Sequence, residues 1–519
     1  MKREELISKL QHQSETGWDI IIIGGGATGS GIALDAVTRG FRTLLLEQSD
    51  FAKGTSSRST KLVHGGVRYL AQGDILLVLE ALHERGRILK NAPHLTANQE
   101  FIIPIYSWFD AMIYTVGLKF YDLLAGKLSL GKSYFINRSR TLTRLPNIKQ
   151  EGLKGGVVYH DGQFDDSRMT LALAGTYIVK GGIALNYFKV CDLVKNEEGK
   201  ITGVRALDLK SGNEYALKSK LVINATGVFA DDILRLDNPR SNPIIRPSQG
   251  VHIVLKSSFL QSSSAIMIPK TDDGRVLFAI PWYGRVVVGT TDTPLDKISL
   301  EPVALEEEIT FILRTAEKYL VRPPKREDVL SVFAGLRPLA SDPENPVATK
   351  EISRRHKIIL SKSDLLTVTG GKWTTYRMMA EETLDKAIKA GILRKGRCIT
   401  KNLKLNSIPA IVSSKHLQIY GAQAVEIEKI IEDNPGLGVP LSPALPYSKA
   451  EIIWICRNEM PLTLEDMLAR RTRALFLDAR ASEAIAPEVA WLMAQELGFD
   501  ENWQKGQLEI YRDLIKSYF

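Results

Sequence analysis

The spacing of apolar residues changes along the chain and predicts a different element at each change. Residues 19–23 are a short and almost wholly apolar run, which predicts a strand buried on both faces of a parallel sheet. Residues 32–37 place apolar side chains on one helical face, and Gly40 is a suitable residue at which that helix ends. Residues 42–47 predict a second strand. Together the three segments predict a βαβ unit.

Further strands are predicted later in the chain, and their pattern differs from that of the first two. Residues 156–159 and 221–225 are short apolar runs, and residues 190–195 form a predicted hairpin with residues 201–208. Between residues 247 and 293 apolar and polar residues alternate and turn signals interrupt them. That alternation predicts antiparallel sheet.

The pattern changes again late in the chain. Residues 365–369 predict a last buried strand, and residues 374–390 predict a helix. Beyond residue 395 no strand alternation is clear, and the proline-rich residues 435–446 are followed by segments with helical spacing. We expect these segments to form a separate C-terminal helical domain; they are residues 449–457, 463–468, 484–497 and 502–518.

Composition limits the class of protein. The 519 residues are 44% apolar and 24% charged, which is too apolar for a disordered chain. Three widely spaced cysteines, Cys191, Cys398 and Cys456, exclude a disulfide scaffold and a zinc site, so no metal is expected. The first residues lack the apolar segment of a secretory signal, and no apolar run reaches the roughly 18 residues of a membrane span. We expect a soluble or peripheral protein in a reducing compartment.

A glycine-rich turn follows the first predicted strand and opens the first helix. It has the form Gly24-x-Gly26-x-x-Gly29, and Glu47 ends the next strand. In a dinucleotide site the glycines let the backbone approach a pyrophosphate, the helix N-terminus faces the negative charge, and the acidic residue binds the ribose hydroxyls. The alternative is a glycine-rich turn in an ordinary α/β sheet, but the strand–turn–helix context favours the nucleotide.

Several further blocks of sequence extend this signal. The chain has Thr-Ser-Ser-Arg-Ser-Thr-Lys-Leu-Val-His-Gly-Gly-Val-Arg-Tyr-Leu at residues 55–70, Asn-Ala-Thr-Gly at 224–227, and Thr-Gly-Gly-Lys-Trp-Thr-Thr-Tyr-Arg at 369–377. Gly-Val-His at 250–252 and Gly-Leu-Arg-Pro-Leu at 335–339 lie between them. From about residue 19 to 390 these blocks resemble the FAD-dependent glycerol-3-phosphate dehydrogenases, within the wider family of amino-acid and glycine oxidase flavoproteins.

The resemblance implies an α/β fold in which a doubly wound, Rossmann-like FAD-binding domain is assembled from separated segments. It also implies an inserted antiparallel-sheet substrate domain and a C-terminal helical domain. On this basis the oxidoreductase unit spans residues 17–399 and the helical domain residues 400–519. The FAD-binding segments are roughly 17–100, 150–245 and 330–395, and the substrate segments are roughly 100–150 and 245–330.

The resemblance further implies which residues contact FAD, the expected cofactor. They fall in the glycine-rich turn, in the block after Glu47, on the predicted hairpin and at two later strand ends. The residues are Gly24, Gly26, Ala27, Thr28, Gly29, Glu47, Thr55, Ser56, Ser57, Lys61, Leu62, His64, Val190, Ala225, Thr226, Gly227, Gly371, Lys372, Trp373 and Thr374.

The implied reaction is oxidation of sn-glycerol 3-phosphate to dihydroxyacetone phosphate, with hydride transfer to FAD. His252 is the candidate base, because an ordinary histidine pKa lies near the operating pH. Arg337 is the candidate for binding phosphate or the reacting oxygen through paired hydrogen bonds, and Lys372 is a second catalytic cation. The structural alternatives are a core histidine for His252, a surface salt bridge for Arg337 and a solvated lysine for Lys372.

Three more residues are carried over as substrate contacts: Arg68, Tyr69 and Arg354. Packing beneath the flavin is the alternative for the first two. Arg354 is followed by Arg355 and His356, where the family often has an acidic residue and histidine, so its ion pairing departs from the pattern.

The resemblance also implies the electron acceptor and the location. The short stretch from Arg337 to Lys372 favours the branch that reduces membrane quinone over the oxidase branch that uses oxygen. No EF-hand is present, which favours a bacterial enzyme on the cytoplasmic face of the inner membrane. The aromatic residues of 108–121, interleaved with Lys119, Lys127 and Lys132, suit an anionic membrane surface, with a substrate-domain core as the alternative.

Other functions remain open at this stage. An enzyme of the same fold could oxidise an amino acid or 2-hydroxy acid, with Arg337 binding the carboxylate, and a flavin-binding regulatory protein would not catalyse at all. A homo-oligomer is left open, and no nucleic-acid partner is expected.

Overall fold

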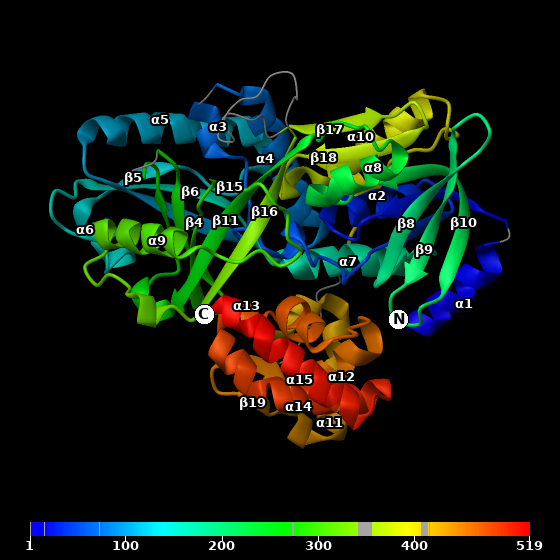
Figure 1. Cartoon of the computed structure of the whole chain (residues 1–519). Helices are drawn as coiled ribbons and strands as arrows, with labels where there is room; N and C mark the ends of the chain where they lie inside the picture. Colours follow the sequence, from blue (N-terminus) through cyan, green and yellow to red (C-terminus); the bar gives the residue numbers. More distant parts are fainter. Residues whose placement is uncertain are drawn as a thin grey trace.

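Two sheets lie side by side, and a helical domain covers the junction beneath them in the computed structural model (Figure 1). The structure describes residues 2–14, 16–71, 73–271, 274–340, 355–405, 414 and 416–519. The N-terminal helix α1 (Arg3–Ser14) lies at the outer side of the first sheet, and the C-terminus lies where the helical domain meets the second sheet (Figure 1).

The first sheet contains the predicted βαβ unit. Its central strands are parallel, and their order through the sheet is β17-β18-β10-β1-β2-β7. The helix α2 follows β1, as the apolar spacing predicts. The bounds are β1 (Trp18–Ile23), α2 (Ala27–Thr38), β2 (Thr43–Leu46), β7 (Ile183–Leu185), β10 (Glu214–Asn224), β17 (His356–Leu360) and β18 (Leu365–Gly370).

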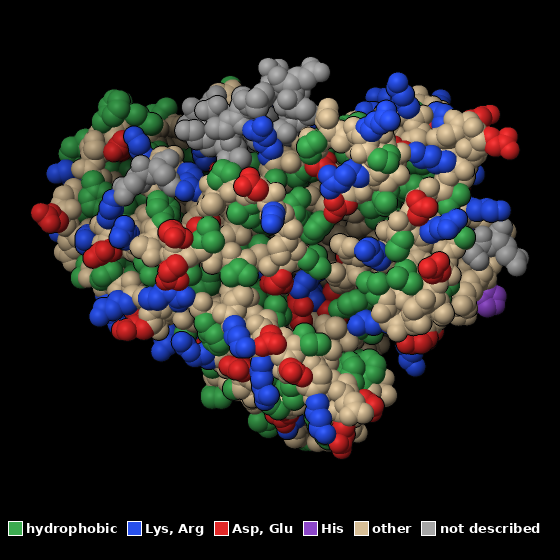
Figure 2. Space-filling view, viewed as in Figure 1, with side chains coloured by type: hydrophobic (Ala, Val, Ile, Leu, Met, Phe, Trp, Pro, Cys, Tyr) green, Lys and Arg blue, Asp and Glu red, His purple; other side chains and the backbone are tan. Residues whose placement is uncertain are grey.

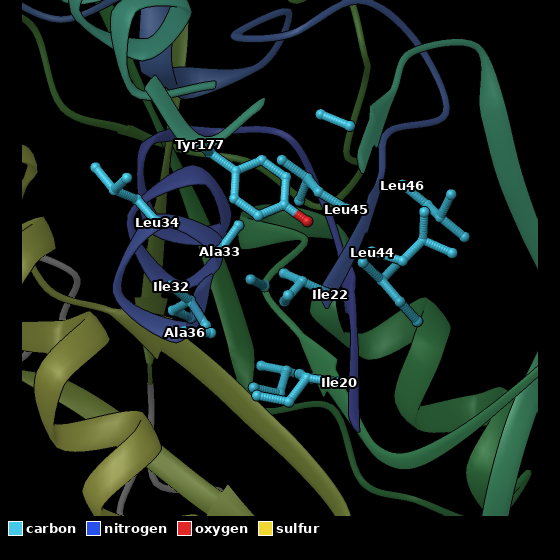
Figure 3. Close-up of a cluster of buried hydrophobic side chains, with 14 of the residues drawn as sticks. Ile20, Ile22, Ile32, Ala33, Leu34, Ala36, Leu44, Leu45, Leu46 and Tyr177 are labelled. Carbon is cyan, nitrogen blue, oxygen red and sulfur yellow. The ribbon is translucent and has the colours of Figure 1, made fainter. Parts of the chain in front are cut away.

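The core of this sheet is built where α2 and α7 (Asp166–Val179) cover β1 and β2 (Figure 3). Ile20, Ile22 and Leu44 are fully buried there. Tyr177 from α7 lies in the same cluster and donates its hydroxyl hydrogen bond to the Thr43 carbonyl at 2.7 Å. The α7 helix therefore fixes the strand edge through both apolar packing and a buried hydrogen bond.

The remaining elements of this half confirm the predicted hairpin. β8 (Phe188–Lys195) and β9 (Ile201–Asp208) pair antiparallel, and β9 also pairs antiparallel with β10. The helices α8 (Ala230–Asp237) and α10 (Tyr376–Lys389) complete the layers around the sheet.

The second sheet has ten strands, in the order β15-β11-β14-β13-β12-β4-β6-β3, with β16 also beside β11 and β5 beside β6. It is mixed, because β12 pairs parallel with β4. The bounds are β3 (Leu62–Val63), β4 (Thr96–Ile105), β5 (Tyr134–Asn137), β6 (Gly155–Phe164), β11 (Ile245–Lys256), β12 (Ala265–Ile268), β13 (Leu277–Trp282), β14 (Arg285–Gly289), β15 (Thr293–Pro294) and β16 (Ser331–Ala340).

Two strands of this sheet lie in segments that the resemblance assigns to FAD binding. The sequence assigns residues from about 150 and from about 330 to the nucleotide-binding half. In the structure β6 pairs with β4 over ten residue pairs, and β16 pairs with β11 over ten. Both strands therefore belong to the second sheet.

Helices cover the outer faces of the second sheet (Figure 1). α5 lies along the top of this half and α9 lies across the face that carries β11. The bounds are α3 (Val67–Ala71), α4 (Ile75–Asn91), α5 (Trp108–Ala125), α6 (Arg138–Arg144) and α9 (Glu306–Tyr319).

The C-terminal domain is helical, as predicted, with its own buried core. It differs from the prediction in a short two-stranded sheet and in a π-helix, η10 (Asp466–Arg471), where an ordinary helix is expected. The bounds are α11 (Ala424–Asp433), β19 (Pro440–Ser442), β20 (Leu445–Ser448), α12 (Lys449–Asn458), α13 (Ala474–Leu477), α14 (Ala479–Leu497) and α15 (Glu501–Ile515).

Candidate active site

A cavity of about 850 Å³ runs from the carboxyl ends of β1, β2 and β10 to the inner face of the second sheet. Ile23, Leu46 and Ala225 line it at the first sheet, and Gly250 and Thr290 line it at the second. Ligands of doubly wound sheets bind outside the carboxyl ends of the parallel strands. The cavity is therefore the candidate active site, and its volume suits a dinucleotide with a small substrate.

Two glycines of the first turn are required by geometry. Gly24 has φ +108°, and a Cβ there would lie 2.6 Å from the Ala225 carbonyl oxygen. A Cβ on Gly29 would lie 1.9 Å from the Gly24 carbonyl oxygen. The turn is thus packed directly against the end of β10, which brings its backbone to the cavity wall.

Glu47 and Ser56 hold the turn from two sides. The Glu47 carboxylate accepts hydrogen bonds from the backbone N–H groups of Gly25, at 2.6 Å, and Ser49, at 2.9 Å. Burial raises the pKa of Glu47, while these two hydrogen bonds oppose the rise. The Ser56 hydroxyl accepts from the N–H of Ala27 at 2.9 Å. The loop after Glu47 therefore positions the N-terminus of α2.

The late block at residues 371–374 closes the cavity from another side. Trp373 donates its ring N–H to the Ser56 carbonyl at 3.1 Å. The Thr374 hydroxyl accepts from the backbone N–H of His64 at 3.2 Å. Burial lowers the pKa of His64 to about 4, so its ring is neutral. The glycine-rich turn, the loop that contains Ser56 and His64, and residues 371–374 thus meet around one site.

Most predicted site residues line this cavity. All three predicted catalytic residues line it, as do Arg68 and Tyr69, whereas Arg354 lies outside the described residues. The predicted cofactor contacts that line it are Gly24, Gly26, Ala27, Thr28, Glu47, Thr55, Ser56, Leu62, His64, Val190, Ala225, Thr226, Gly227, Gly371, Lys372, Trp373 and Thr374.

Three predicted cofactor contacts do not line the cavity: Gly29, Ser57 and Lys61. Gly29 supports the turn from behind, as described above. The Lys61 ammonium instead points away and donates to the Asp166 carboxylate and the Ser57 carbonyl, both at 2.8 Å. Burial lowers the pKa of Lys61 to about 7, partly offset by Asp166. The structure therefore gives Lys61 a supporting role beneath the site.

His252 lies on β11 and is only 2% exposed. Its Nε2 is 2.9 Å from the Thr60 hydroxyl, and its ring stacks on Phe333 at 4.9 Å between centroids. Burial, with smaller effects of Lys61 and Arg337, holds its pKa well below the ordinary value. This corrects the expectation of an ordinary histidine pKa: the ring is neutral, because protonation would place a cation beside two others in a buried position.

Arg337 lies on β16, and its guanidinium is fixed by the neighbouring strands. It donates to Asp292 at 3.1 Å, to the Thr291 carbonyl at 2.8 Å and to the Gln249 carbonyl at 3.1 Å. The side chain is still 24% exposed toward the cavity. Arg337 is thus a preorganised cation rather than half of a surface salt bridge.

Lys372 and Tyr69 both line the cavity and are in direct contact. The Lys372 ammonium lies 3.8 Å from the centre of the Tyr69 ring, a cation–π contact. Arg68 lies beside Tyr69 on α3 and also lines the cavity. The first and last sequence blocks therefore form one wall.

Sequence reasoning missed several residues that line the cavity. Thr290, Thr291 and Asp292 lie in the run Gly-Thr-Thr-Asp at residues 289–292, which is similar to the same family and could have pointed to them. Thr60 lies within the block at 55–70, although the resemblance does not single it out. The others carry no local motif, because they come from strands, or from the turn before one, that are distant in sequence: Phe101, Tyr159, Asp161, Met267, Arg275 and Phe278.

The cavity lining includes seven Lys or Arg residues and two buried imidazoles, His64 and His252, whose pKa values burial lowers. The cations are Lys53, Arg58, Arg68, Lys189, Arg275, Arg337 and Lys372. This arrangement can bind a small anion and accept a proton. Within the described ranges, no group of three or more His, Cys, Asp or Glu side chains could hold a metal ion.

Comparison with known proteins identifies the family. A family model described as "FAD dependent oxidoreductase" matches residues 19–380, and one described as "C-terminal domain of alpha-glycerophosphate oxidase" matches residues 361–504. The mitochondrial glycerol-3-phosphate dehydrogenase of Bos taurus is 41% identical over 99% of this chain and 75% of its own length. The mitochondrial glycerol-3-phosphate dehydrogenase of Arabidopsis thaliana is 39% identical over 96% of this chain and 86% of its own length.

Solved structures agree as well. The glycerol-3-phosphate dehydrogenase of Bacillus halodurans, complexed with FAD, is 30% identical with a TM-score of 0.80, covering 100% of this chain and 97% of that one. The chain therefore belongs to the FAD-dependent oxidoreductases. Within that family it belongs with the glycerol-3-phosphate dehydrogenases, because those relatives match both the nucleotide-binding part and the C-terminal domain.

The residues present fit FAD. The glycine turn leaves a cradle that a Cβ would fill, because a Cβ on Gly26 would lie 2.9 Å from the Ser56 hydroxyl. The α2 helix begins at the cavity, and a helix N-terminus favours a negatively charged group such as a pyrophosphate. Glu47 lies at the end of β2, where a ribose binds in this fold.

Proposed function

We propose that this protein oxidises sn-glycerol 3-phosphate to dihydroxyacetone phosphate and passes the electrons to a membrane quinone. The observation that carries the proposal is the convergence of His252, Arg337 and Lys372 on the cavity that also holds the nucleotide turn. FAD, when bound, accepts the hydride from the carbinol carbon. The protein must then bind a phosphate dianion, orient the secondary alcohol and take one proton.

The cations of the cavity wall supply the binding. Arg337 is held by Asp292 and two carbonyls, so its guanidinium meets the anion without a large loss of side-chain entropy. Lys372 and Arg68 add positive charge to the cavity lining. A dianionic phosphate gains more from several converging cations than a single carboxylate does. The site therefore favours a phosphorylated alcohol over an amino acid or 2-hydroxy acid.

His252 supplies the proton acceptor. Its pKa is depressed, so the ring is neutral and able to accept the hydroxyl proton over the physiological pH range. A bound phosphate would lower the cost of the imidazolium that forms, because it opposes the nearby charge of Arg337. The proton thus has a defined destination inside the chain.

The exposed face of α5 supports a membrane acceptor. Trp108, Phe109, Val116 and Leu123 are 63%, 65%, 63% and 74% exposed, and apolar side chains gather over this helix in Figure 2. On the opposite side of the same helix Tyr121 is buried. The inner face of α5 therefore packs in the protein core, whereas its exposed outer face suits contact with a membrane surface.

The charge and position of this face favour an anionic lipid surface as its occupant. Lys119, Lys127 and Lys132 are exposed on or just after α5. The inner residues of α5 pack with Tyr69 and Leu70, next to the cavity wall. A quinone dissolved in the bilayer would therefore approach near the site. No helix within the described part of the chain is long and apolar enough to span a membrane.

The test is anaerobic mixing of the FAD-loaded protein with glycerol 3-phosphate, followed by a ubiquinone analogue or by oxygen in separate samples. We expect the flavin to bleach with substrate and to be reoxidised much faster by the quinone. Faster reoxidation by oxygen would assign the protein to the oxidase branch, and absence of bleaching would leave a non-catalytic flavoprotein.

A further inference from the structure

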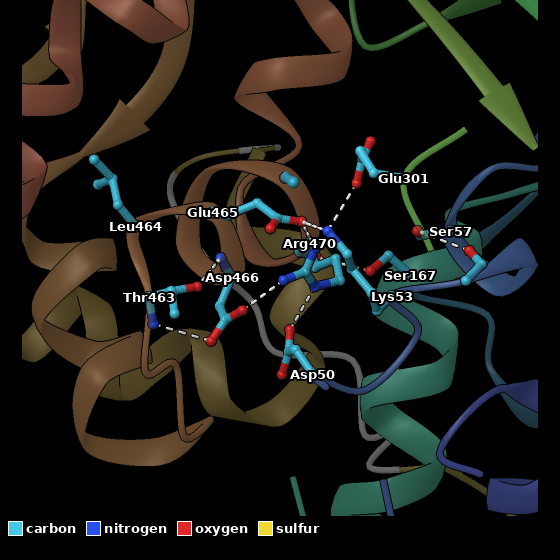
Figure 4. Close-up of polar contacts among 12 residues, drawn as sticks. Asp50, Lys53, Ser57, Ser167, Glu301, Thr463, Leu464, Glu465, Asp466 and Arg470 are labelled. Atoms are coloured by element: carbon cyan, nitrogen blue, oxygen red, sulfur yellow. Dashed lines mark hydrogen bonds and ion pairs between the residues drawn. The ribbon is translucent and has the colours of Figure 1, made fainter. Parts of the chain in front are cut away.

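A network of buried charges joins the C-terminal domain to the segment that forms the cavity floor (Figure 4). Arg470 on the π-helix pairs with Asp50 at 2.5 Å and with Glu465 at 2.5 Å. Lys53, which lines the cavity, pairs with Glu465 and with Glu301 of the substrate domain. Asp50 and Arg470 are at most 2% exposed at their side chains. The C-terminal domain is thus bonded directly to the loop that follows Glu47.

A second buried cluster, centred on Asp166 at the start of α7, lies closer to the reacting groups. One carboxylate oxygen accepts from the Ser59 N–H at 2.9 Å, the Ser59 hydroxyl at 2.7 Å and the Lys61 ammonium at 2.8 Å. The other oxygen accepts from Arg473 at 3.1 Å. Burial alone would raise the pKa of Asp166, but Lys61 and Arg473 lower it below the ordinary value, so the carboxylate is ionised.

Arg473 comes from the C-terminal domain and adopts a left-handed backbone, φ 64°, directly after the π-helix. Its guanidinium donates to the Ser57 carbonyl at 2.8 Å as well as to Asp166. The segment 57–61 is therefore fixed at Ser57, Ser59 and Lys61 by one buried cluster that the C-terminal domain completes.

Thr60 lines the cavity, as do Arg58 and Ser59 of the same segment, and it is the one of the three that contacts His252. Its hydroxyl lies 2.9 Å from His252 Nε2. His252 Nδ1 is buried and has no hydrogen-bond partner among the described residues. Among the described residues, the Thr60 contact is consequently the hydrogen bond that orients the ring. A threonine hydroxyl can donate or accept, so the contact can form with either neutral tautomer.

We propose that Thr60 and Arg473 are positioning residues for His252: Thr60 fixes the imidazole directly, and the C-terminal domain fixes Thr60 through Arg473 and Asp166. The catalytic consequence rests on the proposed function, whereas the effect on the imidazole does not. The proposal assigns the C-terminal domain a role in the reaction, although none of its described residues lines the cavity.

A double-mutant cycle with Thr60→Val and Arg473→Met tests this. Each change should slow flavin reduction by saturating glycerol 3-phosphate by about 10- to 100-fold, as expected when a reacting group is misplaced, with little change in FAD affinity. Because Arg473 is proposed to act through Thr60, Arg473→Met should add almost nothing in the Thr60→Val background. Thr60→Ser, which keeps the hydroxyl, should restore most of the rate.

Fully additive effects, or Thr60→Val at the parental rate, would overturn the proposal. Arg457→Met is the matched control, because Arg457 lies on the same domain in an exposed pair with Glu496. If Arg473→Met fails to fold, Arg473→Lys replaces it, since Lys retains one donor.

Nitrogen NMR of the FAD-loaded protein, with ¹⁵N-labelled histidine, provides a readout that does not need turnover. The protein has eight histidines, and the His252 signals are assigned by their loss in His252→Asn. We expect the His252 signals of the parent to report one hydrogen-bonded ring nitrogen, and we expect these signals to shift in both variants. Unchanged His252 signals in both variants would contradict the proposal. If the parent flavin is not reduced by glycerol 3-phosphate, the proposed function fails while these spectra still decide the positioning role.

Discussion

At the scale of single residues, burial decides what His252 can do. An ordinary histidine would titrate near neutral pH, whereas this ring lies beneath Thr60, against Phe333 and near two cations. A depressed pKa means that the ring loses its proton well below neutrality. At physiological pH almost all of His252 is then in the neutral, proton-accepting form, so raising the pH further does not increase that fraction.

His252→Asn should therefore lower the rate of flavin reduction by about 10²–10⁴-fold, the usual contribution of a positioned proton acceptor. The parent rate should not rise with an ordinary histidine ionisation between about pH 6 and 8. Stopped-flow bleaching with saturating glycerol 3-phosphate and no acceptor measures both. A variant that bleaches at the parental rate would remove His252 from the mechanism.

Arg337 should not be replaceable by lysine. The guanidinium uses two nitrogens at once, bonding Asp292 and Gln249 from one and Thr291 from the other. Lysine has one side-chain nitrogen, so it cannot keep both sets of hydrogen bonds and also bind the substrate. We expect Arg337→Lys to cost about 2–4 kcal/mol in kcat/KM, with FAD affinity unchanged. Parental kcat/KM in this variant would make Arg337 a structural residue.

At the scale of elements, the sequence predicts what is local and misses what depends on pairing between distant strands. The βαβ unit follows from residues 19–47 alone, because strand, turn and helix are consecutive. The apolar run at residues 156–159 predicts part of β6, and no strand is predicted at β16. The sheet that each strand joins depends on its distant partner, β4 or β11, and is not written in the local sequence. Likewise, family motifs locate His252, but its Thr60 partner is 192 positions away.

The exposed face of α5 yields a prediction at this scale. The protein should bind vesicles that contain anionic phosphatidylserine, and less strongly at high salt, because exposed lysines are screened beyond about 8 Å at physiological ionic strength. Replacing Trp108 and Phe109 by Ser should abolish most of this binding in a flotation assay. Trp491→Ser is the control, since Trp491 is 52% exposed on α14 of the C-terminal domain. Vesicle binding that survives the α5 double variant would point to another surface.

At the scale of the whole molecule, buried ion pairs hold the three parts together. In Figure 2 acidic and basic side chains meet in the hollow between the C-terminal domain and the two sheets. Burial would raise the pKa of Glu465, but Arg470 and Lys53 lower it to about 2. Since this lies below the ordinary value of 4.5, Glu465 contributes stability above about pH 4.5 and loses it as the pH falls toward 2.

Glu465→Gln should therefore lower the free energy of unfolding by on the order of 3 kcal/mol at pH 7, and by clearly less at about pH 3. Urea unfolding of the FAD-loaded protein at both pH values measures the difference. Glu501→Gln is the control, because Glu501 is exposed on α15. A difference that stays constant with pH would show that the Glu465 carboxylate charge is not what stabilises the junction.

The central claim is that the cationic cavity selects a phosphorylated secondary alcohol. Its most direct test is anaerobic mixing of the FAD-loaded protein with sn-glycerol 3-phosphate, glycerol, glycine or lactate, each without an acceptor. The structure predicts complete flavin bleaching and one dihydroxyacetone phosphate per flavin with glycerol 3-phosphate, and slow or absent bleaching with the other three. Bleaching by glycine or lactate, with none by glycerol 3-phosphate, would contradict it.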